Sequence, residues 1–346
     1  MSAAHASPAS LATSASPTAL AAPASPDFGG LLATGERRLA EAGAEDPRGD
    51  AIRLLCVCAG CDRAMLISRS RELPAAPVRD KFYSYIERRA RKEPVQYIIG
   101  EWEFMGLPFA VNRDVLIPRP DTECLVECVL SELGANPRST IPAAPPVKTP
   151  FILDLCTGSG CVAVSLAVFI PNALIVAADI SDGALRVAVD NARLNGVGER
   201  IFFAAGDLYD PIKKPELCAF YRNAPARPGI EKAACGEAAD EILFDAICAN
   251  PPYVACEEMA MLPEDVRMYE PKSALDGGAR GLGFFLRIAE GAAGRLKTGG
   301  ILAVEVGAGQ ARIVENIFIQ CGFSGIRTCR DVRGIERVVL ARKMGK

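Results

Sequence analysis

The tetrapeptide Asn250-Pro251-Pro252-Tyr253 is the part of the sequence best suited to chemistry. It follows the apolar run 242–249, which predicts a buried strand. Proline has no N–H group to donate, so two consecutive prolines cannot continue a sheet ladder and the chain must leave the sheet at Asn250. In open α/β sheets, ligands bind at the carboxyl ends of the strands. An amide, a backbone carbonyl and an aromatic ring are therefore expected at a ligand-binding edge.

These groups are suited to holding a planar NH2 group. The side-chain carbonyl of Asn250 and the backbone carbonyl of Pro251 can each accept one of its hydrogens, and the ring of Tyr253 can stack on its face. The nitrogen then directs its lone pair at an electrophile. We predict that Asn250, Pro251 and Tyr253 are catalytic and that Pro252 helps them to bind the substrate. A purely structural turn at the end of a strand is the alternative.

A second candidate site follows a predicted strand at 151–156. Glycines in the next segment allow positive φ angles and a close approach of a ligand, and the helix that begins there exposes backbone N–H donors. Asp179 ends the following predicted strand, where a carboxylate can bind ribose hydroxyls. The predicted cofactor-binding residues are Asp154, Cys156, Thr157, Gly158, Ser159, Gly160, Asp179 and Asn250.

This loop alone does not identify the cofactor. Gly158, Gly160 and Ala163 also match the G-x-G-x-x-A pattern of NAD-binding enzymes. A dehydrogenase needs a proton donor or acceptor beside the hydride, often histidine, and the only histidine is His5 near the amino terminus. S-adenosylmethionine uses the same kind of loop and ribose carboxylate, and it also needs a positioned nucleophile. The two sites together therefore favour S-adenosylmethionine over NAD.

Composition narrows the possible classes of protein. The chain has 346 residues and a formal net charge of −3, which gives no overall attraction to nucleic acid. No apolar run approaches the roughly 18 to 20 residues of a membrane helix. The 13 cysteines are scattered, and Cys56, Cys58 and Cys61 have no second cluster to complete a four-ligand zinc site. We expect reduced thiols, no metal, no binding to membrane or nucleic acid, and a cytoplasmic location.

The first third of the chain predicts a helical module with a hairpin after it. We expect a disordered tail at 1–27, a helical domain at 28–95 that recognises the substrate, and a β-hairpin linker at 96–120. Within this region, a helix is expected to follow Pro74 and Pro77, with one face formed by Val78, Phe82, Tyr85 and Ile86. Further core residues are expected to be Leu54, Leu55, Met65, Leu66 and Ile67. The segment Tyr97–Val111 is expected to form a strand, a turn at Met105-Gly106 and a second strand.

The remainder, 121–346, predicts an α/β domain with a seven-stranded, mostly parallel sheet. Strands are expected at 151–156, 174–179, 201–206, 242–249, 301–306, 325–330 and 335–341, and helices at 121–133, 161–169, 182–195, 282–296 and 310–321. A short turn joins the last two strands, so one of them should run antiparallel. The segment 136–150 is expected to be a linker, and 211–241 an insertion without chemistry.

Taken together, these motifs resemble class I, Rossmann-like methyltransferases that act on amino or amide nitrogens. Further blocks resemble protein-glutamine methyltransferases of the HemK/PrmC type: Glu93–Gly100, Val115–Glu123, Glu270–Gly278, Glu305-Val306-Gly307 with Gln310, and Asp331-x-x-Gly334-x-x-Arg337. The resemblance covers about residues 80–341. Two positions depart from the family pattern, namely Arg280, usually Asp, and Cys156, often Gly.

The resemblance implies a function and further site residues. Members of this family methylate the side-chain amide of the glutamine in the Gly-Gly-Gln loop of class-1 peptide-chain release factors. Asp207 and Leu208 are then expected to bind the cofactor and Arg119 the substrate, in an enzyme that acts as a monomer. The alternatives are a ribosomal-protein glutamine methyltransferase, an adenine or guanine amino methyltransferase, and a cofactor-binding protein without catalysis.

Overall fold

The computed structural model describes residues 26–135, 149–213, 215–223 and 242–345, and the chain divides into two compact units, 1–86 and 87–346. The predicted tail, the linker at 136–150 and the insertion at 211–241 lie largely outside the described residues. The domain boundaries drawn from the sequence stay predictions.

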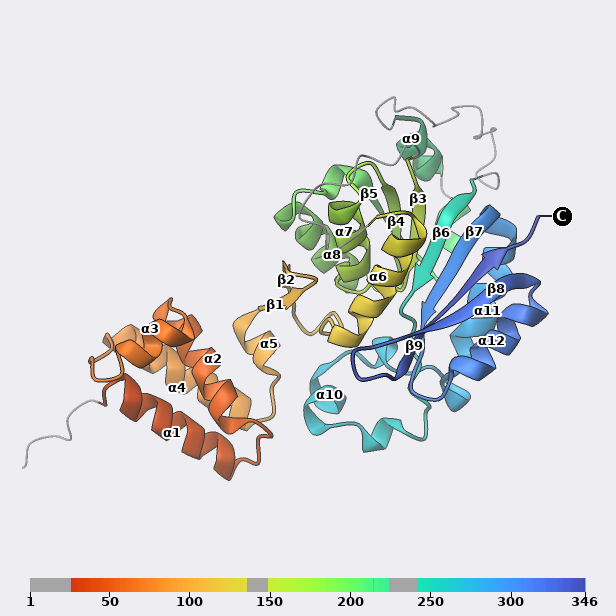
Figure 1. Ribbon diagram of the computed structural model, residues 1–346. Helices are drawn as coiled ribbons and strands as arrows, with labels where there is room; N and C mark the ends of the chain where they lie inside the picture. Colours follow the sequence, from red (N-terminus) through yellow and green to blue (C-terminus); the bar gives the residue numbers. More distant parts are fainter. Residues whose placement is uncertain (1–25, 136–148, 214, 224–241, 346) are drawn as a thin grey trace, which may run out of the picture. The chain divides into compact units, whose positions relative to one another are not determined.

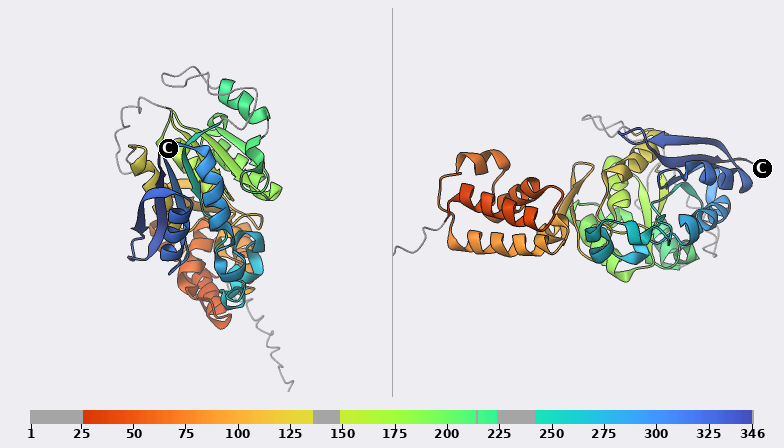
Figure 2. Two further views of the ribbon diagram at one scale, coloured as in Figure 1. Left: turned by 90° about the vertical axis from the view of Figure 1, so that its right-hand side faces the viewer. Right: turned by 90° about the horizontal axis from the view of Figure 1, so that it is seen from below.

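In its described residues, the first unit consists of helices (Figure 1 and Figure 2), and these helices bury apolar side chains between them. They are α1 (Phe28–Glu41), α2 (Pro47–Ala59), α3 (Arg63–Ser68) and most of α4 (Ala76–Ala90), and an aspartate caps the start of each of the first three. Leu54, Leu55, Phe82 and Ile86 are buried as predicted. Two predictions were wrong. Met65 and Ile67 are 49% and 64% exposed, because the short α3 buries only the face of Leu66, and Pro77 lies inside the first turn of α4.

The hairpin is confirmed, but its start was predicted wrongly. Residues 97–99 belong to helix α5 (Val95–Ile99) rather than to a strand, because Pro94 begins this helix and Gly100 ends it with a φ of 84°. Strands β1 (Glu101–Phe104) and β2 (Leu107–Ala110) then pair antiparallel, with Trp102 opposite Phe109. Met105 and Gly106 both have positive φ, as a tight hairpin turn requires.

A seven-stranded sheet forms the centre of the second unit within the described residues. Its strands are β3 (Phe151–Leu155), β4 (Leu174–Asp179), β5 (Ile201–Ala205), β6 (Phe244–Ala249), β7 (Leu296–Glu305), β8 (Phe323–Arg330) and β9 (Glu336–Lys343). Their order is β5-β4-β3-β6-β7-β9-β8, and only β9 runs antiparallel to its neighbours. The predicted antiparallel partner among the last two strands is therefore confirmed. The long strand β7 begins five residues before the predicted start at 301.

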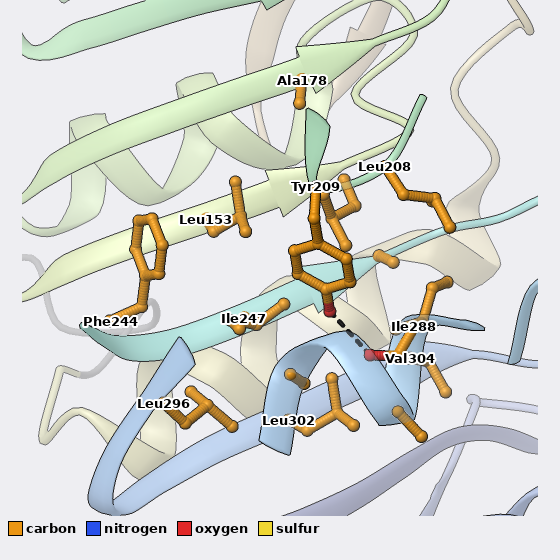
Figure 3. Packing of buried hydrophobic residues seen from close by; sticks show 14 of the residues in the cluster. Leu153, Ala178, Leu208, Tyr209, Phe244, Ile247, Ile288, Leu296, Leu302 and Val304 are labelled. Carbon is orange, nitrogen blue, oxygen red and sulfur yellow. Dashed lines mark hydrogen bonds between the residues drawn. The ribbon is translucent and has the colours of Figure 1, made fainter. Parts of the chain in front are cut away.

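Helices cover both faces of this sheet (Figure 1). One face packs against α6 (Glu123–Glu132), α7 (Cys161–Phe169) and α8 (Asp182–Leu194), and the other against α11 (Gly283–Arg295) and α12 (Ala311–Gln320). Tyr209 links the sheet region to α11, because its hydroxyl donates to the carbonyl of Ile288 at 2.7 Å (Figure 3). The structure adds α9 (Pro215–Asn223) and α10 (Glu264–Tyr269), which the sequence did not predict. No helix in the described ranges is long and apolar enough to cross a membrane.

Candidate active site

The segment between β3 and α7 forms a tight loop above a fully buried strand. Cys156, Gly158 and Gly160 all have positive φ angles, of 58°, 55° and 79°. A Cβ atom on Gly158 would meet nothing within 4 Å, whereas one on Gly160 would lie 3.0 Å from the Cβ of Ala188 in α8. Gly158 therefore leaves open space above the backbone, and Gly160 allows α8 to pack closely below it.

Asp154 and Thr157 support this loop from beneath. Asp154 is almost completely buried, and its carboxylate accepts a hydrogen bond of 2.6 Å from the hydroxyl of Thr157. Burial raises the pKa of Asp154 to about 7, and the bond from Thr157 opposes the rise. Asp154 thus acts through the loop and does not line the cavity described below.

Asp179 ties the loop to the end of β4. One oxygen of its carboxylate accepts from the backbone N–H of Gly158 at 2.9 Å, and the other accepts from Ser181 at 2.9 Å. Burial raises its pKa, and these backbone bonds oppose the rise. Each carboxylate oxygen has two acceptor sites, so both oxygens can still accept from a ligand.

A cavity of about 450 Å³ opens beside this loop. Ten of the predicted site residues line it: Arg119, Cys156, Thr157, Gly158, Ser159, Asp179, Asp207, Leu208, Asn250 and Pro252. Four do not, namely Asp154, Gly160, Pro251 and Tyr253; the last three are each next in sequence to a lining residue, and Asp154 is two residues from Cys156, which lines the cavity. The lining also includes Thr122, Ile180, Lys272, Phe284 and Arg287, to which the sequence assigned no role. The structure therefore brings the two candidate sites together around one cavity.

The backbone of the tetrapeptide 250–253 is fixed by close contacts with neighbouring segments. The side chain of Gln310 donates to the carbonyl of Tyr253 at 3.0 Å and accepts from the N–H of Gly307 at 2.9 Å. A Cβ on Gly281 would lie 2.0 Å from the same carbonyl, and one on Gly277 would lie 2.7 Å from the carbonyl of Pro252. Only glycine fits at these two positions, so the loop cannot shift without disturbing its support.

The side chains of the tetrapeptide have well-defined partners. The amide nitrogen of Asn250 donates to the hydroxyl of Thr122 at 3.0 Å, and the hydroxyl of Tyr253 donates to Glu305 at 3.2 Å. Burial, followed by the nearby charge of Glu305, raises the pKa of Tyr253 well above its usual range. Tyr253 therefore remains a neutral phenol and is not a base.

Three of the charged residues that line the cavity, Arg119, Asp207 and Arg287, form ion pairs. A guanidinium nitrogen of Arg119 lies 2.6 Å from the carboxylate of Glu270, whose pKa is raised by burial despite this cation. Arg287 in α11 contacts Asp207 at the same distance of 2.6 Å. Each pair fixes the direction of a predicted ligand-binding side chain.

Asn191 is a structural residue of the site that the sequence did not indicate. Its side chain is fully buried in α8, accepts from the N–H of Ala110 at 2.7 Å, and donates to the carbonyls of Ala110 and Ser159. It therefore connects the hairpin to the loop between β3 and α7. A polar residue on the buried face of a predicted helix is the signal that would have found it.

The strand order, the glycine-rich loop and the cavity at the carboxyl ends of the strands define a class I methyltransferase with a Rossmann-like fold. Family models agree: the "PrmC N-terminal domain" matches residues 30–100, and the "Methyltransferase small domain" matches residues 139–243. The chain belongs to the family of release factor glutamine methyltransferases, as the resemblance in sequence predicted.

Two curated relatives support this assignment. The chain is 36% identical over 296 residues to the release factor glutamine methyltransferase of Thermodesulfovibrio yellowstonii. The aligned region covers 85% of this chain and 92% of the relative. The chain is 38% identical over 311 residues to the release factor glutamine methyltransferase of Moorella thermoacetica, covering 90% and 96%. Among solved structures, a methyltransferase from Pyrococcus furiosus has a TM-score of 0.42 and 15% identity, over 69% of this chain and 90% of that chain.

Proposed function

We propose that this protein transfers the methyl group of S-adenosylmethionine to the side-chain amide nitrogen of a glutamine in the Gly-Gly-Gln loop of class-1 peptide-chain release factors. The observation that carries the proposal is the side chain of Asn250, which lines the cavity and uses its amide nitrogen on Thr122. Its carbonyl oxygen is thereby available to accept from a substrate NH2 group. The family of the chain supplies the identity of the substrate.

The residues around the cavity fit S-adenosylmethionine. Asp179 retains acceptor capacity for the two ribose hydroxyls, and the open space at Gly158 admits a ligand against the backbone. Asp207, Leu208 and the exposed apolar side chain of Ile180 supply polar and apolar contacts for an adenine ring. When bound, the cofactor supplies an electrophilic methyl group on a positively charged sulfur.

The protein's own contribution is to hold the glutamine nitrogen in line. A carboxamide nitrogen is a weak nucleophile because its lone pair is delocalised into the carbonyl. In the proposed complex its two hydrogens donate to the side-chain oxygen of Asn250 and to the backbone carbonyl of Pro251. Well-oriented reactants recover roughly 7 to 11 kcal/mol of a reaction barrier. Orientation by the rigid loop is therefore the main source of the proposed catalysis.

Tyr253 and Arg119 complete the proposed substrate site. The face of the Tyr253 ring stabilises the positive charge that develops on nitrogen, by about 0.5 to 2 kcal/mol. Arg119 lines the cavity, and its guanidinium group has five N–H donors. One of its nitrogen atoms donates to Glu270. Its remaining donors are available for carbonyl groups of the substrate loop. No strong base is required, because the proton can pass to water after the transfer.

The proposed substrate implies an enzyme of the cytoplasm, where translation takes place. A methyl-transfer assay with labelled S-adenosylmethionine tests the proposal. Purified release factor, ribosomal protein, nucleic acid and buffer alone are compared, and the modified peptide is mapped by mass spectrometry. We expect a gain of one methyl group on the glutamine of the Gly-Gly-Gln loop. Labelling of nucleic acid or ribosomal protein instead would contradict the proposal.

A further inference from the structure

The side chain of Asn250 is held by a residue from a distant part of the chain. Thr122 ends a 3₁₀ turn (Pro120–Thr122) just before α6, and it is only 2% exposed. Its hydroxyl accepts from the amide nitrogen of Asn250 at 3.0 Å, and it also lines the cavity. Rotation of a side-chain amide by 180° exchanges the positions of its oxygen and its NH2 group. The hydrogen bond to Thr122 shows that the NH2 group of Asn250 faces Thr122.

Glu305 interacts with both Thr122 and Tyr253. It ends β7, is fully buried, and accepts from the hydroxyl of Tyr253 at 3.2 Å. The hydroxyl of Thr122 is also close enough to lower the pKa of this carboxyl by hydrogen bonding, although burial has the larger, opposite effect. Among the described residues, the second oxygen of Glu305 has no hydrogen-bond partner.

This arrangement determines which way the Asn250 amide can point. If Thr122 directs its hydrogen toward Glu305, its oxygen can only accept from Asn250. In the reversed orientation, the amide oxygen would face the oxygen of Thr122. Two buried acceptors would then lie together with no hydrogen bond between them, which is unfavourable. The donor edge of Asn250 is therefore kept on the protein side, and the acceptor edge is kept for the substrate.

We propose that Thr122 and Glu305 are positioning residues that keep the carbonyl oxygen of Asn250 directed at the substrate nitrogen and hold the ring of Tyr253 beside it. This inference rests on the proposed function. Neither residue supplies or removes a proton of the reaction. The first acts through the amide of Asn250, and the second acts through Thr122 and Tyr253.

A pair of substitutions at one position isolates the hydroxyl group. Thr122→Val keeps the shape and removes the hydrogen bond, whereas Thr122→Ser keeps the hydroxyl. We expect kcat on release factor to fall about 10- to 100-fold in Thr122→Val, with the calorimetric Kd for S-adenosylmethionine within about threefold of wild type. In Thr122→Ser, kcat should recover to within about threefold. Thr328→Val, on the edge strand β8, is the control for the loss of a threonine hydroxyl elsewhere.

The outcomes separate this inference from the function on which it rests. Wild-type kcat in Thr122→Val, or equal losses in the valine and serine variants, would overturn the positioning role. If Thr122→Val folds poorly, Glu305→Met replaces it, because methionine keeps the length of the side chain and removes both oxygens that accept from Tyr253 and Thr122; we expect a loss in kcat of about tenfold and unchanged cofactor binding. Wild-type protein that is inactive on release factor would instead overturn the proposed function. In that case, a double-mutant cycle of Thr122→Val and Asn250→Ala in urea unfolding still shows whether the two side chains are coupled.

Discussion

Asn250 has both a hydrogen-bond donor and an acceptor on one short side chain, and the proposed function uses each for a different purpose. The nitrogen donates to Thr122, and in the proposed complex the oxygen accepts from the substrate. An aspartate would have no donor for Thr122, and a leucine would offer neither group. The type of residue is therefore as important as its position at the end of β6.

Replacement of Asn250 tests this division of roles. In Asn250→Ala we expect kcat on release factor to fall by about 100-fold or more, since the nitrogen of the substrate loses its orientation. The Kd for S-adenosylmethionine should stay within a few-fold of wild type in calorimetric titration. Asn316→Ala, on the exposed face of α12, is the matched control. Near-normal turnover of Asn250→Ala would exclude the assigned role.

The buried carboxyl of Glu305 predicts an unusual dependence of stability on pH. Its pKa is about 7 in the folded protein because of burial, compared with about 4.3 for an exposed glutamate. Between these two values the folded chain keeps a proton that the unfolded chain has lost. The free energy of unfolding should therefore fall as the pH rises from about 5 to about 7, and then change little above that range.

Urea denaturation at several pH values measures this effect in the wild type and in Glu305→Gln. The slope should be shallower in the variant, which has no proton to lose. Some slope should remain, because burial also raises the pKa of Asp154 to about 7 and acts in the same direction. Identical slopes in the two proteins would show that Glu305 titrates near its usual pKa.

At the scale of elements, the loop between β3 and α7 depends on close packing as well as on positive φ. Gly160→Ala would introduce both a strained φ and a Cβ at 3.0 Å from Ala188. Gly196→Ala introduces a similar strain, at a φ of 69°, but meets nothing within 4 Å. We expect Gly196→Ala to cost about 1 kcal/mol of unfolding free energy and Gly160→Ala about 1 to 3 kcal/mol more.

Chemical denaturation measures both costs, and calorimetric titration should show weaker binding of S-adenosylmethionine only in Gly160→Ala. Equal stability of the two variants would mean that α8 adjusts freely to the added methyl group. The loop would then tolerate side chains more widely than its packing indicates.

The sequence predicted the elements around the site better than the contacts between them. Helix α7 was predicted with its observed bounds, because a glycine-rich loop begins it and its apolar residues continue to 169. The direction of Asn250 could not be predicted, because its partner Thr122 is 128 residues away and only the fold brings them together. The link from Asn191 to the hairpin was missed for the same reason.

At the scale of the whole molecule, the described part of the first unit, 26–86, contains none of the residues that line the cavity. The release factor is a large substrate, and the cavity can accommodate only its loop. We infer that the helical unit contributes to selection of the protein substrate, a role that the sequence predicted for residues 28–95.

Deletion of residues 1–86 tests this role. The shortened protein should bind S-adenosylmethionine with an affinity close to that of the full chain, and it should methylate a short Gly-Gly-Gln peptide at a similar low rate. Methylation of intact release factor should fall at least about tenfold, because the added contacts are lost. Unchanged methylation of the intact factor would contradict the inference, and loss of cofactor binding would show that the remaining unit needs its partner to fold.

The order of strands has a consequence for how the enzyme is made. The last strand, β9, inserts between β7 and β8, so β7 is an exposed edge until residues 336–343 have been synthesised. A strand whose partner lies far along the sequence pairs slowly, and until then its open edge can pair with strands of other chains. Arg337, which forms an ion pair with Asp121 beside Thr122, also arrives only then. A nascent chain can thus contain the complete loop 156–160 and the complete tetrapeptide 250–253 while the candidate site is still unassembled. Truncation near the carboxyl terminus should therefore yield aggregated rather than partly active enzyme.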